Sequence, residues 1–219
     1  MNSPDFESDN VFFTNSDAVF VTGLEENFSK VLKIILSDGR IFYTRRQYIH
    51  TPLSIGDRFS NLLLDTLYRA SRIYLAECKA ISLLNYAENS RSMLAVKLTK
   101  KGFAPTEFEP ALDYLEAENF LSDRRFAESW VRSRLKRRVE GPLVVRGKLM
   151  EKGISRQLAD EVVSAYFAEL DETALCSVAL EKQLRKCDDS EKIFRRLQRS
   201  GFSYHCIQAA WKKLQEVSI

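Results

Sequence analysis

The chain has 219 residues, 45% of them hydrophobic, and a formal net charge of +3 at pH 7. This is enough apolar material for one or two domains with a buried core, and no apolar run approaches the roughly 20 residues of a membrane-spanning helix. The N-terminal segment is acidic where a secretory signal would be basic and then apolar, so we expect a cytoplasmic protein without a membrane partner.

Charge is unevenly distributed along the chain. Residues 1–28 contain six acidic residues and no Lys or Arg, whereas residues 120–153 contain ten Lys or Arg and four acidic residues. A basic middle segment behind an acidic tail favours a polyanionic partner, although basic runs on helices are often only solvated faces.

The cysteines do not form a recognisable metal or disulfide pattern, because they are scattered without a Cys-x-x-Cys pair. We therefore expect reduced thiols, most of them buried, and neither a structural zinc site nor a disulfide framework. The four residues are Cys78, Cys176, Cys187 and Cys206.

The N-terminal part is predicted to contain the strands of the protein. We expect residues 1–10 to form a disordered acidic tail and residues 11–56 to form a β-rich segment. Two β-rich runs flank Asp38-Gly39, a pair that predicts a β-hairpin closed by a type I′ turn, because that turn needs positive φ at both central residues. From about Asp57 onward the pattern is helical.

The helical remainder repeats itself. One motif recurs as KLTKKGF, KLMEKGI and RLQRSGF, in which Gly102, Gly153 and Gly201 are 51 and 48 residues apart. Apolar residues stand four and eight positions before each glycine and again six, nine, ten and thirteen after it, which predicts an amphipathic helix on either side. Glycine past the end of a helix favours the left-handed conformation, and Ser155 and Ser203 stand where N-caps of the next helices are expected.

A third helix is predicted before each pair, at residues 57–85, 123–138 and 171–186, and the first of these could be interrupted. The fold class that follows is mainly α, with three tandem three-helix repeats forming an elongated curved body behind a small N-terminal segment that contains a β-hairpin. The repeats are expected at residues 57–119, 120–169 and 170–219.

The helix predicted at residues 123–138 combines an apolar and a basic face. Its apolar half on a helical wheel contains Phe126, Ala127, Trp130, Val131 and Leu135. Arg125, Arg132 and Lys136 line up on the opposite, outward half, available for phosphates or for a partner's carboxylates, with plain solvation as the alternative. Arg134 points into the apolar half, so we expect its stem to pack and its guanidinium to pair with an acid.

Candidate catalytic residues are scarce. The two histidines, His50 and His205, have no partner that the sequence identifies. The sequence contains no glycine-rich phosphate-binding loop, no G-x-S-x-G motif and no carboxylate cluster at metal-ligand spacing. We therefore predict that the protein is not an enzyme and that it binds neither a cofactor nor a metal.

Three segments of the helical part carry motifs that occur together in a known family. They are NSRSMLAVKLTKKGF, LSDRRFAESWVRSRLKRRVEG and KLMEKGI. The first has Arg-Ser ahead of a helix that ends at glycine, the second has an Asp-x-Arg-Phe-Ala helix that ends in basic residues and glycine, and the third is a Lys-Gly-Ile turn. Over about residues 85–170 the chain resembles the bacterial RecX family, regulators of the recombinase RecA. The motif residues expected to be structural are Phe126, Arg134, Gly141, Gly102, Gly153 and Gly201.

This resemblance implies a non-enzymatic regulator that lies in the groove of the RecA filament on single-stranded DNA and impedes ATP hydrolysis and strand exchange. It implies a role in DNA repair, recombination and the SOS response, with the RecA filament and single-stranded DNA as partners. Double-stranded DNA is a further candidate partner, and we expect a monomer. The residues assigned to the filament or its DNA are Arg125, Arg132, Lys136, Arg137, Arg138, Arg146 and Lys148.

Two other interpretations stay open. Each glycine-centred helix pair superficially resembles a helix-turn-helix, so the chain could be a direct DNA-binding repeat protein whose affinity falls steeply with salt. It could also be a scaffold whose repeats bind an unrelated protein. The sequence leaves open whether the recombinase is inhibited or otherwise tuned, and which helical face contacts it.

Overall fold

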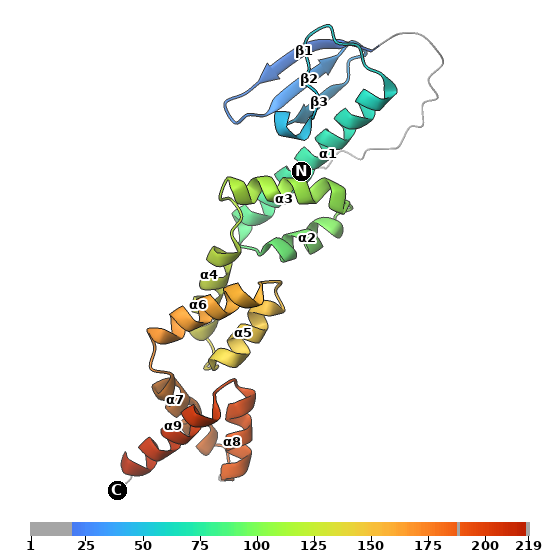
Figure 1. Cartoon of the computed structure of the whole chain (residues 1–219). Coiled ribbons are helices and arrows are strands. Elements are labelled where there is room, and N and C mark those ends of the chain that lie inside the picture. Colours follow the sequence, from blue (N-terminus) through green and yellow to red (C-terminus); the bar gives the residue numbers. More distant parts are fainter. Residues whose placement is uncertain (1–18, 188, 218–219) are drawn as a thin grey trace. The chain divides into compact units, whose positions relative to one another are not determined.

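The computed structural model describes residues 19–187 and 189–217 (Figure 1). The tail predicted at residues 1–10 and the first part of the β-rich segment lie outside the described residues. The chain divides into two compact units whose boundary lies between Tyr74 and Leu75. The described part contains nine α-helices and one small antiparallel sheet, which confirms the predicted mainly α class with a hairpin-containing N-terminal segment.

The N-terminal unit is a three-stranded sheet with the start of α1 on one face. Its elements are β1 (Val21–Glu26), β2 (Leu32–Leu36), β3 (Ile41–Thr44) and the short 3₁₀ helix η1 (Arg46–Tyr48). The strands pair in the order β1-β2-β3, and every second side chain of β2 is buried, as expected for a sheet with one covered face. Helix α1 (Asn61–Tyr86) covers that face, where Thr44 Oγ1 donates a hydrogen bond of 3.0 Å to the Ala70 carbonyl.

The hairpin between β2 and β3 is present, but the predicted type I′ turn is wrong. Gly39 has a φ of +87°, whereas Asp38 does not have a positive φ. The loop holds three residues, because Leu36 O accepts from Gly39 N at 3.0 Å and Leu36 N donates to Arg40 O at 2.9 Å. This is the hairpin in which a type I turn is followed by one left-handed residue, and glycine supplies that residue.

The remaining helices form the predicted tandem three-helix arrangement. They are α2 (Arg91–Thr99), α3 (Pro105–Ala117), α4 (Asp123–Leu135), α5 (Pro142–Met150), α6 (Arg156–Ala168), α7 (Glu172–Leu184), α8 (Ser190–Arg199) and α9 (Tyr204–Val217). In the second repeat α6 packs against α4 and α5, and in the third α7 packs against α8 and α9. Helix α1 runs for 26 residues without the interruption that the sequence left open.

The glycine-centred motif has the structural role that its spacing predicts. Gly102, Gly153 and Gly201 have φ of +83°, +81° and +92°, so each ends its helix in the left-handed conformation. The leucine four positions before each glycine is at most 1% exposed. Ser155 and Ser203 cap the following helices, since each hydroxyl accepts a hydrogen bond from the backbone N–H three residues on, at 3.3 and 3.2 Å.

The glycine turn of the third repeat also joins that repeat to the second. Gly141 N donates to Ser200 O at 2.8 Å, and Leu143 N donates to Gly201 O at 3.3 Å. A Cβ on Gly141 would lie 2.3 Å from the Gly201 carbonyl carbon. Glycine at position 141 is therefore required by the close approach of two backbones.

The glycine turn of the second repeat contacts the first repeat in an equivalent way. The hydroxyl of Ser90, the N-cap of α2, donates to Lys152 O at 2.6 Å, and a Cβ on Gly153 would lie 2.1 Å from Ser92 Cβ. In both joints the carbonyl of the residue before the left-handed glycine accepts a hydrogen bond from the start of the second helix of the preceding repeat. The Arg-Ser and Gly-Pro motifs thus mark the starts of α2 and α5, where the next repeat attaches.

Arg91 ties the first repeat to the start of α4. Its guanidinium pairs with Asp113 and Glu116 of α3 at 2.7 Å each and also with Glu109, while its backbone N–H donates to Asp123 Oδ1 at 2.8 Å. Burial opposes the charge, but the three carboxylates outweigh it and raise the pKa of Arg91 above its ordinary value.

None of the four cysteines, all of which lie in the described part of the chain, forms a disulfide. Cys176 and Cys206 are buried, whereas Cys187 is half-buried and Cys78 is exposed, so the expectation of mostly buried thiols holds for two of the four. Burial raises the pKa of Cys206 to about 12 and raises that of Cys176 in the same direction. These two thiols in the core of the third repeat therefore stay protonated at neutral pH.

Candidate nucleic-acid interface

Helix α4 turns its apolar side to the core of the second repeat. Ser122 caps the helix by accepting a hydrogen bond from Arg125 N at 3.2 Å, and Asp123 places an acid in the first turn, where the helix dipole favours it. Phe126 and Val131 are at most 5% exposed and belong to one apolar cluster with residues of α5 and α6. The other side of α4 is left to solvent and carries cations.

The predicted outward row is exposed, but its three cations differ in what they contact. Arg125 pairs with Glu88 at 2.5 Å and donates to two backbone carbonyls of the preceding loop at 3.1 and 2.8 Å, so it attaches α4 to the end of the first repeat. Arg132 and Lys136 have no side-chain partner among the described residues, and we call these two the α4 stripe. Their charges are available to another molecule.

Arg134 lies on the apolar half and has an acidic partner. It forms two parallel hydrogen bonds with Glu140, of 2.5 and 2.8 Å, and the two side chains are only 21% and 13% exposed. Its guanidinium carbon is 5.0 Å from the centroid of the Trp130 ring, and Lys152 Nζ is 5.6 Å from the same centroid. Arg134 thus holds the chain after α4 in place and stacks on an aromatic ring.

A depression of about 410 Å³ opens between the end of α4 and the turn after α5. We call it the basic depression; its lining residues are Trp130, Arg134, Arg138, Lys148, Glu151 and Lys152. Lys148 Nζ bonds both oxygens of Glu151, at 2.9 and 2.8 Å. Arg138 and Lys152 have no carboxylate partner in the described part of the chain, so the depression keeps a net positive charge.

Two of the residues assigned to the interface are used within the second repeat. Arg146 of α5 pairs with Asp160 of α6 at 3.0 Å, and Arg137 donates to Ser133 Oγ at 2.9 Å. The seven assigned cations therefore differ in what they contact. Arg138 and Lys148 line the basic depression, Arg132 and Lys136 form the α4 stripe, and Arg125 and Arg146 hold helices together.

Sequence reasoning assigned Trp130 to the core and did not assign Lys152 to the interface. Trp130 is only half-buried, since one side of its ring packs on the core while Arg134 and Lys152 lie over it. Lys152 immediately precedes the left-handed Gly153, and the turn at this glycine brings it back toward α4. The sequence carries no signal specific to Lys152, because Lys101 stands in the same position before Gly102.

Cations without carboxylate partners beside an aromatic ring can bind the phosphates of a nucleic acid or the carboxylates of a protein. No group of three metal-ligating side chains occurs among the residues that the structure describes. Within that same part of the chain, no helix combines the length and the hydropathy needed to cross a bilayer.

Comparison with known proteins places these helices in a family. Residues 122–163, which contain α4, α5 and most of α6, match the family model described as RecX, second three-helix domain. The regulatory protein RecX of Treponema pallidum (strain Nichols) is 37% identical over 134 residues, covering 61% of this chain and 82% of the relative. That of Chlorobaculum tepidum is 34% identical over 138 residues, covering 61% and 84%. A crystal structure of regulatory protein RecX has a TM-score of 0.73 at 20% identity, covering 89% of this chain and 99% of that one.

Proposed function

Because this chain belongs to the RecX family, we propose that it is a non-enzymatic regulator that binds the RecA filament on single-stranded DNA and inhibits its ATP hydrolysis and strand exchange. In this role it acts in the cytoplasm as a monomer, in DNA repair, recombination and the SOS response. Its partners are the recombinase and the DNA that the recombinase coats, either single-stranded or double-stranded.

The observation that carries the proposal is the set of unpaired cations in the second repeat. The α4 stripe, Arg138 and Lys152 have no carboxylate partner in the described part of the chain, whereas Arg125, Arg134, Arg146 and Lys148 each pair with an acid. Unpaired, exposed cations contribute little to the stability of a monomer. They are favourable where a partner presents phosphates or carboxylates.

Inhibition of the cognate RecA tests the proposal. The readout is the hydrolysis of ATP by RecA on single-stranded DNA as this protein is added, beside the binding of the protein to the same DNA alone. We expect hydrolysis to fall at protein concentrations well below those that coat naked DNA. The double variant Arg132→Glu with Lys136→Glu is expected to have a half-inhibitory concentration roughly tenfold higher than the unmodified protein, because two attractive charges become repulsive.

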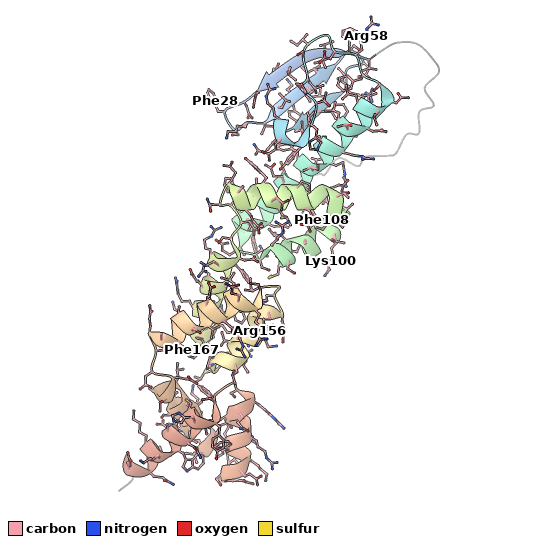
Figure 2. All side chains as sticks on the ribbon, in the orientation of Figure 1. Phe28, Arg58, Lys100, Phe108, Arg156 and Phe167 are labelled. Carbon is pink, nitrogen blue, oxygen red and sulfur yellow. The ribbon has the colours of Figure 1, made fainter. Side chains whose placement is uncertain are left out.

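A double charge reversal elsewhere is the matched control. Lys100 and Lys101 follow α2 in the first repeat, and both are exposed; Figure 2 shows Lys100 extending from that turn. The variant Lys100→Glu with Lys101→Glu changes the net charge equally and is expected to inhibit nearly as well as the unmodified protein. Full inhibition by the α4 stripe variant would refute the assignment of the stripe.

A direct DNA-binding role is the second candidate. It is favoured by the helix pair α5 and α6, which meet at a left-handed glycine in the manner of a helix-turn-helix, next to the unpaired cations. Tight binding to naked DNA that weakens steeply with salt, without any effect on ATP hydrolysis, would establish this candidate in place of filament regulation.

A further inference from the structure

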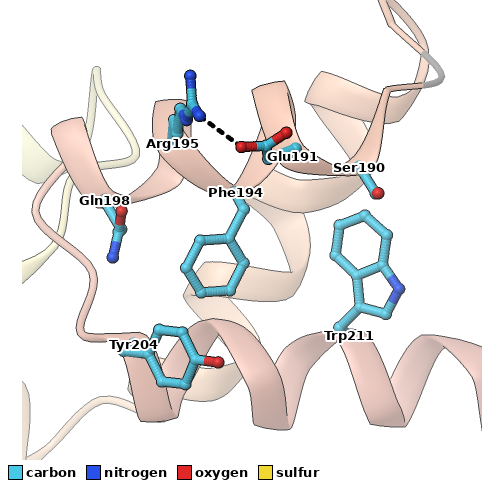
Figure 3. A pocket seen from close by; sticks show the side chains of 7 residues that line it. All are labelled: Ser190, Glu191, Phe194, Arg195, Gln198, Tyr204 and Trp211. Carbon is cyan, nitrogen blue, oxygen red and sulfur yellow. Dashed lines mark hydrogen bonds and ion pairs between the residues drawn. The ribbon is translucent and has the colours of Figure 1, made fainter.

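The third repeat contains an aromatic pocket that the proposed function does not use. It lies between α8 and α9, has a volume of about 530 Å³, and we call it the α8/α9 pocket (Figure 3). Its lining residues are Ser190, Glu191, Phe194, Arg195, Gln198, Tyr204 and Trp211. Ligand pockets in proteins fall in the range of roughly 300–1,000 Å³, so this one is large enough for a small aromatic group.

Three aromatic rings form the floor and walls of the pocket. Figure 3 shows Phe194 extending from α8 toward α9, between Tyr204 and Trp211. Phe194 and Tyr204 have ring centroids 4.9 Å apart at an interplanar angle of 60°. Tyr204 and Trp211 are seven residues apart and therefore lie on one face of α9, two turns from each other. Tyr204 is 58% exposed, so much of its ring is open to solvent.

The repeat architecture does not require aromatic residues at these positions. Phe194, Tyr204 and Trp211 stand seven before, three after and ten after the glycine of their repeat. The equivalent residues are Ala95, Pro105 and Leu112 in the first repeat and Arg146, Arg156 and Val163 in the second. The first and second repeats thus form the same helix pair without any aromatic ring at these positions. The fully buried core of the third repeat consists of other side chains, among them Ile193, Leu197 and Ile207, and Phe194 and Trp211 pack against its edge.

The two helices of the pocket carry more basic than acidic residues. Residues 189–216 contain six Lys or Arg and three acidic residues, Asp189, Glu191 and Glu216. Glu191 pairs with Arg195 at the mouth of the pocket (Figure 3). The cation that lines the pocket is Arg195, whose side chain is 66% exposed, while Arg199 and Lys213 lie outside the lining.

Among the described residues, no aliphatic side chain lines the α8/α9 pocket. A groove for an apolar peptide helix would present leucine, isoleucine or methionine, whereas this pocket offers aromatic faces, the hydrogen-bonding side chains of Ser190 and Gln198, and a cationic rim. Rings that stack on bases, combined with cations that contact phosphates, are the chemistry by which proteins bind single-stranded nucleic acid.

We propose that the α8/α9 pocket receives a base of a single-stranded nucleic acid, with the exposed ring of Tyr204 stacking on the base, Trp211 forming the opposite wall and Arg195 contacting a flanking phosphate. This inference deepens the proposed function, on which it rests for the source of the strand, because the filament carries single-stranded DNA. The proposed function relies on contacts between cations of the second repeat and charged groups of the partner. The pocket adds a contact between the third repeat and a base.

The test compares the full-length protein's affinity for two fluorescent strands of equal length, an oligothymidylate and its abasic analogue, by fluorescence anisotropy. The abasic strand keeps the phosphates and lacks the bases. We expect tighter binding to the oligothymidylate, and we expect Tyr204→Ala to reduce that affinity by roughly fivefold or more while leaving the abasic strand unaffected. Tyr204→Phe keeps the ring and is expected to keep the affinity.

Tyr86→Ala is the matched control, because Tyr86 is 94% exposed at the end of α1 and lies outside the pocket. A second readout is the quenching of Trp211 fluorescence by the oligothymidylate in a Trp130→Phe background, where Trp211 is the only tryptophan. Melting curves followed by circular dichroism establish that each variant is folded.

Equal affinity for the two strands, or an unchanged affinity in folded Tyr204→Ala, would overturn the inference. Quenching of Trp211 by an acidic peptide but not by the oligothymidylate would assign the pocket to a protein partner instead. The outcome is separable from that of the proposed function. Inhibition of RecA without base-dependent binding would support the proposed regulatory function and refute the role of the pocket. Tyr204-dependent binding without inhibition would support the role of the pocket and refute the proposed regulatory function.

Discussion

At the scale of single residues, the cations of the second repeat divide by what they contact. Arg134 is fixed by a two-pronged bond to Glu140 and by the face of Trp130, and Arg125 is fixed by Glu88 and two backbone carbonyls. Side chains held in this way stabilise the fold and have little charge left for a partner. Residues in one basic run therefore have different roles, because their neighbours in space differ.

Arg134→Ala is expected to lower the melting temperature. The substitution leaves the carboxylate of Glu140, which is 13% exposed, without a cation, and it removes the group that stacks on Trp130. A cost of about 1–3 kcal/mol corresponds to a fall of several degrees in a chain of this length. Circular dichroism at 222 nm measures the melting curve. Arg134→Lys keeps the charge but cannot form the two parallel bonds, so its melting temperature should lie between those of the unmodified protein and Arg134→Ala. An unchanged melting curve for Arg134→Ala would show that this residue is not structural.

At the scale of elements, the repeats are joined by backbone contacts at their glycine turns. The turn at Gly201 lies against Gly141 and Val144 at the start of α5, and the turn at Gly153 lies against Ser92 at the start of α2. Gly102 belongs to the first repeat, and no described atom lies within 4 Å of the Cβ that an alanine would add there. The same motif therefore has one role in the first repeat, ending a helix, and two roles in the others.

Gly201→Ala is expected to destabilise the protein more than Gly102→Ala. Both substitutions place alanine at a positive φ, which costs about 1–2 kcal/mol. At position 201 the new Cβ would also lie 2.5 Å from Val144 N, so the joint between the second and third repeats must move. Urea denaturation followed by tryptophan fluorescence measures the difference between the two free energies of unfolding. Equal losses for the two variants would show that the joint tolerates the added methyl group.

At the scale of the whole molecule, the two compact units have separate cores. The core of the N-terminal unit contains buried residues of the sheet and of the start of α1, including Leu67. The buried residues of the other unit belong to all three repeats, with Leu94 and Leu112 among those of the first. The repeat boundaries proposed from the sequence, at residues 57–119, 120–169 and 170–219, assign all of α1 to the first repeat. The boundary between the two compact units instead lies within α1, after Tyr74. We propose that α1 serves both, as the cover of the sheet and as the first helix of the first repeat.

Leu67→Ala is expected to destabilise the N-terminal unit alone. Leu67 is 1% exposed, and removal of such a side chain costs roughly 2–5 kcal/mol. Both tryptophans, Trp130 and Trp211, lie in the other unit, so their fluorescence should keep its urea midpoint while the transition seen by circular dichroism broadens toward lower urea. Val163→Ala, in the core of the second repeat, is the control that should shift the fluorescence midpoint. A shift of the fluorescence midpoint in Leu67→Ala would mean that the two units unfold together.

The mainly α class, the helix ends at Gly102, Gly153 and Gly201, the caps at Ser155 and Ser203, and the resemblance to RecX proteins could be predicted from the sequence. These features depend on local physics, namely backbone conformation at glycine, capping of free amides and burial at the helical period.

Only the tertiary structure decided the geometry of the hairpin turn, the contact between Gly141 and Gly201, and which cations are unpaired. Arg125 meets Glu88 from 37 residues away and Arg146 meets Asp160 from another helix, and no helical wheel contains such neighbours. The basic depression and the α8/α9 pocket arise in the same way, from side chains of different helices brought together by the left-handed glycine turns. Sequence periodicity specifies which side of a helix is buried, whereas the charge and shape of a site depend on distances through space, which the packing of the helices sets.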